Sequence, residues 1–180
     1  MCANTGDLRP AAVQPLEQGV DHVRGSEAGR LILEYGDYEC PYSRAAFRAI
    51  EEVERELGGN LLFAFRHFPL TEIHPHALAA AAAAEAAALQ DRFWLMHGVL
   101  FHRQKALAEG DLRRYAGELE LEVERFDRDR AGAGVLARVD RDVQSGLASG
   151  EVLGTPTLFI DGVVYRGSHD AASLLAALGG

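Results

Sequence analysis

The chain changes abruptly from one hydrophobic period to another near residue 40. Residues 31–33 are a continuous apolar run that Gly36 ends, a pattern typical of a buried strand in the centre of a sheet. Further on, apolar residues recur at spacings of four, three and four with charged residues between them, at Ala46, Ile50, Val53 and Leu57. This period predicts an amphipathic helix that begins at Pro41 and ends at Gly58 and Gly59.

A second apolar run follows this helix directly. Residues 61–68 are rich in aromatic side chains and lie between Asn60 and Pro69, so they predict a second strand. Strand, helix and strand in this order predict a right-handed parallel βαβ unit. Residues 20–23 predict a short edge strand before it, and residues 1–18 show no period and predict an extended N-terminal arm.

The next eighty residues, from about 71 to about 150, carry a helical pattern almost throughout. Pro75 marks the start of a helix whose body, residues 77–88, is nearly all alanine. This run is read either as low-complexity sequence or as a helix packed tightly against its neighbours, and alanine's helix propensity and small size favour the second. Four more helical segments are predicted, at residues 91–101, 112–119 (capped by Asp111), around Val123 and Phe126, and 135–147 with apolar residues every fourth position.

Strand patterns return at the C-terminal end. Residues 157–160 and 163–166 predict two strands joined by a tight Asp161-Gly162 turn. Residues 171–178 predict a final helix, with Asp170 as its cap. The predicted fold class is therefore α/β, with a βαβ half and a ββα half separated by a helical insertion.

The composition of the chain restricts its possible partners and location. The chain of 180 residues is 48% hydrophobic and 25% charged, with a net charge of −9. Residues 19–180 are long enough for one domain with a real core, and the acidity argues against nucleic acid and anionic membranes as partners. The opening from Met1 to Pro10 lacks the pattern of a leader, and Glu85 interrupts the longest apolar run. A cytoplasmic location without membrane insertion is the expectation.

The predicted strand-to-helix turn carries the candidate chemistry. Cys40 precedes the first helical residue, so its sulfur lies near unpaired backbone N–H groups and the positive end of the helix dipole, which favours a thiolate. Ser43 follows one turn later, where its hydroxyl can donate to the sulfur. The alternative is an inert core cysteine, which has no need of Pro41 after it.

Four sequence segments around these features resemble one family. They are Glu34-Tyr35-Gly36-Asp37-Tyr38-Glu39-Cys40-Pro41-Tyr42-Ser43, Phe65-Arg66-His67-Phe68-Pro69-Leu70, Phe93-Trp94-x-Met96-His97 and Gly154-Thr155-Pro156-Thr157. With the order of predicted elements, they resemble the DsbA-like branch of the thioredoxin fold, closest to the bacterial DsbA-like domains that also occur fused to sodium/proton antiporters. The resemblance covers roughly residues 20–178.

The resemblance implies a role for each motif residue. Cys40 is the expected nucleophile of a thiol–disulfide oxidoreductase, with Pro41 and Tyr42 tuning its redox poise. Thr155-Pro156 is the expected cis peptide bond beside the sulfur, where the backbone before the proline pairs with a substrate strand.

The resemblance also gives Glu34 a role. It stands at the position of a buried acid that relays protons to or from the sulfur. The alternative for Glu34 is a solvent-facing glutamate at a strand edge.

Ser43 departs from the family pattern, because most relatives that exchange disulfides have a second cysteine there. A serine cannot resolve the mixed disulfide that Cys40 forms. Three accounts stay open: a natural monothiol enzyme using glutathione or another small thiol, an engineered replacement, or resolution by Cys2. We favour the first, with no bound cofactor, glutathione as candidate co-substrate, and protein or small-molecule thiols and disulfides as partners; the oligomeric state stays open.

Two other functions remain as alternatives. One is a glutathione-dependent transferase or isomerase of the kappa-class type, although the basic candidates near the active face are few: Arg44, Arg66 and Arg166. The other is a non-catalytic peptide-binding module of thioredoxin-like fold. Five histidines raise the question of a metal, but none shows zinc-site spacing with cysteine, so no metal is expected: His67, His74, His76, His97 and His102.

Overall fold

The computed structural model describes residues 13–179 and contains one mixed five-stranded sheet. The strand order is β1-β3-β2-β4-β5. β2 pairs in parallel with β3, and the other neighbours are antiparallel. The predicted central position of the first buried strand is therefore confirmed. The strands are β1 (His22–Gly25), β2 (Arg30–Gly36), β3 (Leu61–His67), β4 (Thr157–Ile160) and β5 (Val163–Tyr165).

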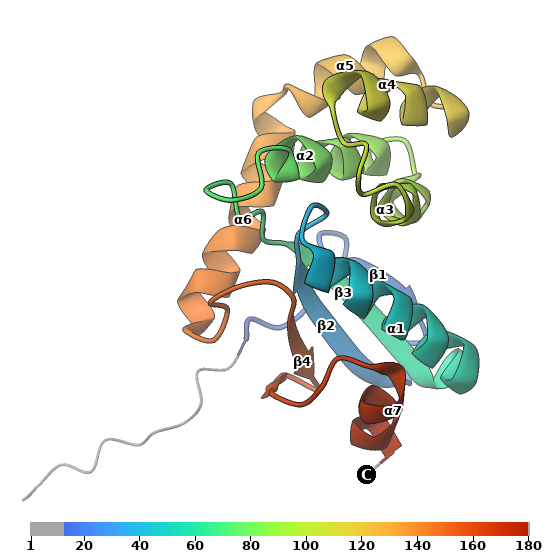
Figure 1. Cartoon of the computed structure of the whole chain (residues 1–180), viewed down its shortest axis with the longest axis vertical. Coiled ribbons are helices and arrows are strands. Elements are labelled where there is room, and N and C mark those ends of the chain that lie inside the picture. The colour runs from blue at the N-terminus through green and yellow to red at the C-terminus, as the bar shows by residue number, and fades with distance from the viewer. Residues whose placement is uncertain (1–12, 180) are drawn as a thin grey trace, which may run out of the picture.

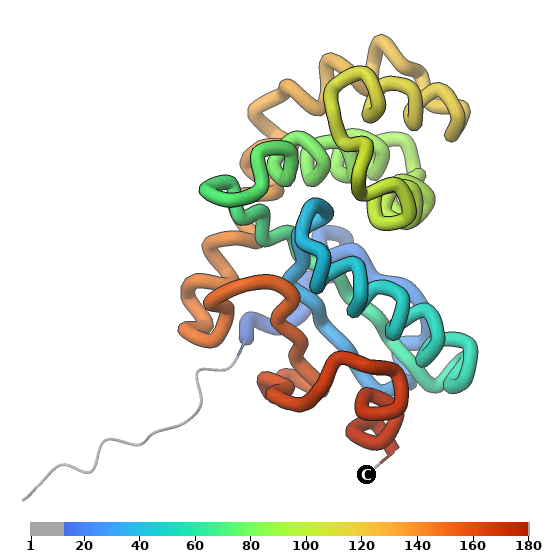
Figure 2. Tube along the Cα trace, in the orientation of Figure 1, coloured from blue at the N-terminus to red at the C-terminus, as the bar shows by residue number. Residues whose placement is uncertain are grey.

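Helices cover both faces of the sheet and extend beyond it (Figure 1). They are α1 (Pro41–Leu57), the short 3-10 helix η1 (Gly58–Asn60), α2 (Ala77–Ala88), α3 (Phe93–His102), α4 (Glu109–Glu118), α5 (Val123–Arg130), α6 (Ala133–Ser149) and α7 (Ala171–Gly179). α2 to α6 all lie between β3 and β4 in the chain, as the trace in Figure 2 shows. The βαβ and ββα halves separated by a helical insertion are confirmed.

The alternation of side chains along the strands divides the core in two. On β2, Ile32 and Glu34 face the side of α1, where the larger apolar cluster also takes in α2, α3 and α7. Leu33 and Tyr35 face the opposite side, where a smaller cluster includes Val13 and receives Val143 of α6. Both faces of β2 are thus buried, as expected of a central strand.

The alanine-rich helix is a packing element. α2 contacts α3, α4, α5 and α6, and the alanines from 80 to 87 are buried. Small side chains allow this close approach to four neighbours. The packed-helix interpretation of this run is confirmed.

The predicted cap of one helix is wrong, and the four-residue apolar series of another helix leaves the core before its end. Asp111 lies inside the first turn of α4, whose N-cap is Ala108. Leu147 is 54% exposed, although Val135 and Val139 of the same four-residue series are buried. Since an α-helix has about 3.6 residues per turn, each step of four rotates the side chain by about 40°, and the fourth member has left the buried face.

The C-terminal predictions are confirmed. Asp161 and Gly162 have φ values of 48° and 83°, the left-handed pair that a two-residue hairpin turn of this type requires. Asp170 caps α7, since its carboxylate accepts a hydrogen bond of 2.9 Å from the backbone N–H of Ser173.

The N-terminal arm is only partly within the structure described. Residues 1–12, and with them Cys2 and its predicted role, lie outside the described residues. Val13 is 7% exposed and packs against the smaller core, so the following part of the arm belongs to the fold. Within residues 13–179, no helix has the length and apolarity needed to cross a bilayer.

Candidate active site

Cys40 occupies the N-cap of α1, with Pro41 at the start of the helix. Its backbone is extended, with φ −73° and ψ 121°, as is usual for a residue that enters a helix. The thiol donates a hydrogen bond of 3.3 Å to the carbonyl oxygen of Thr155, and the Thr155–Pro156 peptide bond is cis. Two motifs 115 residues apart in the chain therefore meet at one sulfur atom.

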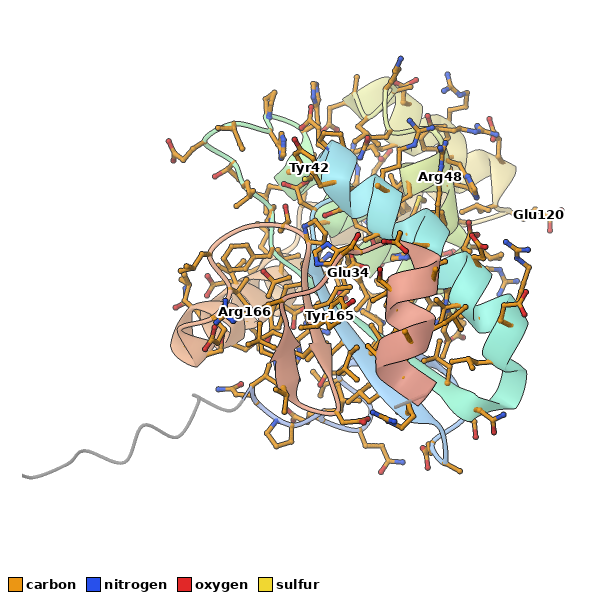
Figure 3. The ribbon with its side chains drawn as sticks, turned by 60° about the horizontal axis from the view of Figure 1, so that its bottom comes forward. Glu34, Tyr42, Arg48, Glu120, Tyr165 and Arg166 are labelled. Atoms are coloured by element: carbon orange, nitrogen blue, oxygen red, sulfur yellow. The ribbon has the colours of Figure 1, made fainter. Side chains whose placement is uncertain are left out.

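Cys40 is buried at the start of α1. The residue is 3% exposed, whereas its neighbour Tyr42 is 73% exposed on the first turn of α1 (Figure 3). Neither apolar cluster of the described residues includes Cys40. Its thiol contacts the backbone of the loop that holds Thr155.

Asp37 holds the turn that leads into α1. This buried carboxylate accepts hydrogen bonds from the backbone N–H of Glu39 at 2.8 Å and of Leu70 at 2.9 Å, and lies 2.7 Å from Nδ1 of His74. Its backbone carbonyl accepts from the N–H of Cys40 at 3.1 Å. The turn is thus tied to the loop that follows β3.

Gln104 fixes the same turn from the helical insertion. Its side-chain amide donates to the carbonyl oxygens of Tyr38 at 2.8 Å and Cys40 at 2.9 Å. Sequence reasoning missed Gln104, which lies in a loop and carries no motif. It also gave no role to Asp37, although an acid just before a predicted helix start is a recognisable signal.

Ser43 lies one turn into α1, as predicted, and is fully buried. Its hydroxyl oxygen accepts a hydrogen bond of 3.2 Å from the backbone N–H of Asp37. The expected hydrogen bond from Ser43 to the sulfur is not among those of residues 13–179, in which the thiol pairs with Thr155 instead. In this structure Ser43 stabilises the turn.

Glu34 is fully buried on the α1 side of the sheet, opposite Phe65 of β3 and Leu158 of β4. Figure 3 shows it in the interior, in the region between α1 and α7. Neither carboxylate oxygen has a hydrogen-bond partner among the described residues, and burial raises the pKa of Glu34 to about 8. The alternative of a solvent-facing glutamate at a strand edge is wrong, because β2 is central.

The family model described as Thioredoxin matches residues 17–179, which include the Cys40 turn and the Thr155-Pro156 loop. The chain belongs to the thioredoxin family. Within this family it resembles the DsbA-like branch, whose helical insertion corresponds to α2–α6.

Two curated relatives of this thioredoxin-family chain are sodium/proton antiporters. The Na(+)/H(+) antiporter NhaA 1 of Mycolicibacterium vanbaalenii is 44% identical over 169 residues, which are 92% of this chain and 27% of the relative. The Na(+)/H(+) antiporter NhaA of Herminiimonas arsenicoxydans is 42% identical over 175 residues, 97% of this chain and 28% of the relative. The chain thus spans about a quarter of the length of these relatives.

Several solved structures have a similar fold. A thioredoxin-like oxidoreductase from Silicibacter pomeroyi superposes with a TM-score of 0.78 at 25% identity, covering 89% of this chain and 91% of that one. BdbD from Bacillus subtilis superposes with a TM-score of 0.80 at 21% identity, covering 93% and 95%. The thiol-disulfide exchange protein alpha-DsbA2 from Wolbachia pipientis superposes with a TM-score of 0.77 at 17% identity, covering 90% of this chain and 87% of that one. The last two show the fold alone.

The basic residues expected near the active face are engaged elsewhere. Arg66 is wrong as an active-face candidate: it is fully buried on the opposite side of the sheet and pairs with Asp21 through two hydrogen bonds of 2.8 Å. Burial would raise the pKa of Asp21, but the bonds from Arg66 outweigh it and lower the pKa to about 2. Arg166 pairs with Glu151 at 2.5 Å, and Arg44 lies 3.5 Å from the carbonyl oxygen of His102.

His97, in the Phe93-Trp94-x-Met96-His97 motif, contacts the turn that leads to Cys40. Its Nδ1 lies 3.0 Å from the hydroxyl of Tyr38, and both side chains are fully buried. Burial lowers the pKa of His97 and raises the pKa of Tyr38, so both are neutral at physiological pH. The pair links α3 to the residue two positions before Cys40.

Proposed function

We propose that the chain is a thiol–disulfide oxidoreductase that works through Cys40 alone. The observation that carries this proposal is the contact of 3.3 Å between the sulfur of Cys40 and the carbonyl oxygen of Thr155. A substrate strand that pairs with the backbone of this loop would bring its own sulfur next to Cys40. The oxidoreductases of similar fold add support.

The chemistry is a thiol–disulfide exchange. The thiolate of Cys40 attacks one sulfur of the substrate disulfide, the sulfur–sulfur bond of the substrate breaks, and a new bond joins that sulfur to Cys40. The second substrate sulfur leaves as a thiolate and takes a proton. A carboxyl group with a pKa of about 8, such as Glu34, can hold or release a proton at physiological pH, which suits a proton relay.

The mixed disulfide then needs an external thiol. Ser43 occupies the position of a resolving cysteine and cannot attack a disulfide. Glutathione or another small thiol attacks the sulfur of Cys40, releases the substrate thiol, and a second molecule regenerates the Cys40 thiol as the small-molecule disulfide leaves. The proposal includes no bound cofactor.

Exposed apolar side chains beside the site suit protein substrates. Tyr42 is 73% exposed, and Leu153, two residues before Thr155, is 90% exposed. Such side chains can bind the apolar residues of an unfolded or extended segment. The proposed substrates are therefore protein thiols and disulfides, with small-molecule disulfides as a second class.

A coupled turnover assay tests the proposal. The reduced full chain, a small mixed disulfide and glutathione are combined, and the release of substrate thiol is measured. We expect turnover in the natural chain and in Cys2→Ser, a loss of at least about a hundredfold in Cys40→Ser, and faster release in Ser43→Cys. Unchanged turnover in Cys40→Ser would overturn the proposal.

A further inference from the structure

A second cluster of chemically active side chains lies away from Cys40, where β1, β3 and α2 meet. One carboxylate oxygen of Glu85, on α2, accepts two hydrogen bonds. It lies 2.7 Å from Nε2 of His22 and 2.8 Å from Nε2 of His67. One ligand-capable atom from each of the three side chains lies within 4.8 Å of the other two.

The rings of both histidines are held by packing. His22 stacks on Phe93, with ring centroids 3.4 Å apart and planes at 8°. His67 is buried and lies edge-on to Phe65 and to Phe93. The positions of the two nitrogens are therefore set by the fold before any ligand binds, which lowers the entropic cost of binding.

The charge of the cluster also suits a cation. Glu85 is the single acid in a helix that is otherwise nearly all alanine, and its side chain is only 7% exposed. Its inward position is costly unless it has partners there.

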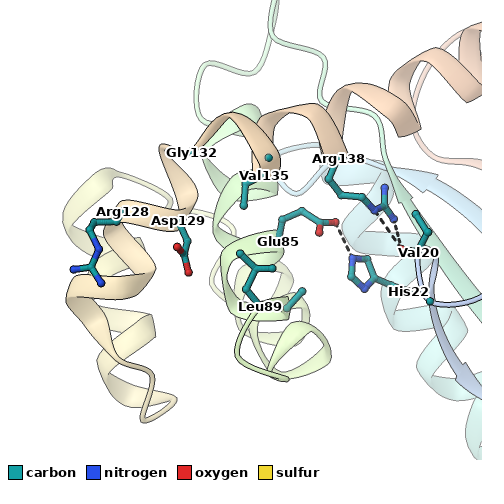
Figure 4. A pocket seen from close by; sticks show the side chains of 12 residues that line it. Val20, His22, Glu85, Leu89, Arg128, Asp129, Gly132, Val135 and Arg138 are labelled. Carbon is teal, nitrogen blue, oxygen red and sulfur yellow. Dashed lines mark hydrogen bonds and ion pairs between the residues drawn. The ribbon is translucent and has the colours of Figure 1, made fainter.

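The cluster opens on a cavity beside α2 and α6 (Figure 4). This cavity has a volume of about 660 Å³, and its lining includes His22, Glu85 and Arg138. Figure 4 shows the carboxylate of Glu85 and the ring of His22 pointing toward one another at its wall. A water molecule or a small ligand can therefore reach this side of the cluster.

We propose that His22, His67 and Glu85 bind a divalent first-row transition metal ion such as Zn²⁺, with its remaining coordination position directed to the cavity. Two histidines and a glutamate with an open fourth position are a known zinc ligand set. Two ligand atoms of a tetrahedral zinc ion lie about 3.3 Å apart, so the Glu85 oxygen must move away from both Nε2 atoms by about half an ångström to admit the ion. Each Nε2 then binds the metal through its lone pair, and the proton that it had donated to Glu85 moves to Nδ1 or is released to solvent. The sequence-based expectation of no metal considered the spacing of histidines with cysteine and left out His22 and Glu85.

Titration of the full chain with Zn²⁺ and with Co²⁺ tests this site. The measurements use a Cys2→Ser, Cys40→Ser background, because thiolates are strong zinc ligands. We expect one ion per chain, measured by competition with a chromophoric chelator. We also expect a Co²⁺ absorption spectrum with the intense visible bands typical of a four- or five-coordinate ion. The thermal unfolding midpoint should rise with Zn²⁺ concentration.

Two variants of the ligands and two controls make the result specific. Glu85→Gln keeps the size of the side chain, and His22→Asn changes a partly exposed residue at the cavity wall. If one of these variants fails to fold, the other still tests the site. Each should weaken Zn²⁺ binding by at least about tenfold. His102→Asn and His76→Asn, which alter exposed histidines elsewhere, should bind as the background does.

Three results would overturn the site. They are less than one ion bound per chain in the background protein, unchanged affinity in folded Glu85→Gln and His22→Asn, and loss of binding in His76→Asn. None of these results bears on the oxidoreductase proposal, because the background protein has no thiol at position 40.

Discussion

Two glutamates buried in this protein have opposite properties. Glu34, on the sheet behind α1, has no hydrogen-bond partner among the described residues, and burial raises its pKa to about 8. Glu85, on α2, has two histidine partners that outweigh its burial and lower its pKa. The same side chain in the same apolar core thus holds a proton at neutral pH in one place and a negative charge in the other.

The difference indicates that the region around Glu85 contributes to stability, whereas the region around Glu34 serves function. Around Glu85 the partners come from β1 and β3, so the ionised carboxylate ties the helical insertion to the sheet. Glu34 has no hydrogen-bond partner within residues 13–179, and an unpaired buried polar group lowers stability. Groups of this kind, with a pKa shifted by burial, are typical of functional sites.

Removal of Glu85 is expected to have the largest effect on stability. Glu85→Ala leaves the buried His67 and the partly buried His22 without their partner and should lower the free energy of unfolding by about 3–5 kcal/mol. Urea unfolding measures the change, and Glu51→Ala, at a partly exposed position of α1, is the control. A loss below about 1 kcal/mol would mean that the cluster does not anchor the insertion.

Replacement of Glu34 should act in the opposite direction and depend on pH. The carboxyl has a pKa of about 8 when folded and an ordinary value of 4.5, so between these values the folded state binds one proton more. The contribution of Glu34 to the stability of the folded state therefore falls as pH rises from about 4.5 to about 8. Glu34→Leu removes this slope and should be more stable at pH 9 by roughly 2–4 kcal/mol, with a smaller gain at pH 6.

Urea unfolding at the two pH values checks this expectation. The same variant should also exchange disulfides more slowly, because the proposed relay is gone. If the two proteins keep the same stability difference at both pH values, the carboxyl does not titrate as the burial of Glu34 requires.

Gln104 should give the smallest effect. Gln104→Ala removes two hydrogen bonds to the Cys40 turn and should cost about 1–2 kcal/mol of stability, with slower exchange at Cys40. Gln90, whose amide also bonds to backbone within the insertion, is the matched control. Gln90→Ala should leave the exchange rate unchanged; an equal slowing in both variants would argue against a specific clamp.

The parts of the fold that follow from local pattern were predictable. The strand before Cys40, the helix after it and the Asp161-Gly162 turn depend on period and turn chemistry, which neighbouring residues determine. Asp111 was misassigned, because the cap rule was applied to a residue inside the first turn of α4. This error concerns a single helix position rather than the existence of an element.

The site itself was predictable only in part. The meeting of Cys40 with Thr155 came from family resemblance, since 115 residues separate them. Arg66 was placed on the wrong face, because a strand residue's face depends on which neighbours cover it. Gln104 and the partners of Glu85 depend on the packing of the insertion against the sheet, which no local pattern records.

The most direct test of the central claim is to locate the mixed disulfide. The reduced full chain is incubated with oxidised glutathione, and the adduct is mapped by peptide mass spectrometry in the natural chain, Cys2→Ser and Ser43→Cys. We predict a long-lived adduct on Cys40 in the first two and rapid clearance in Ser43→Cys, where a resolving thiol is present. Absence of any adduct on Cys40, with the protein folded, would contradict the account.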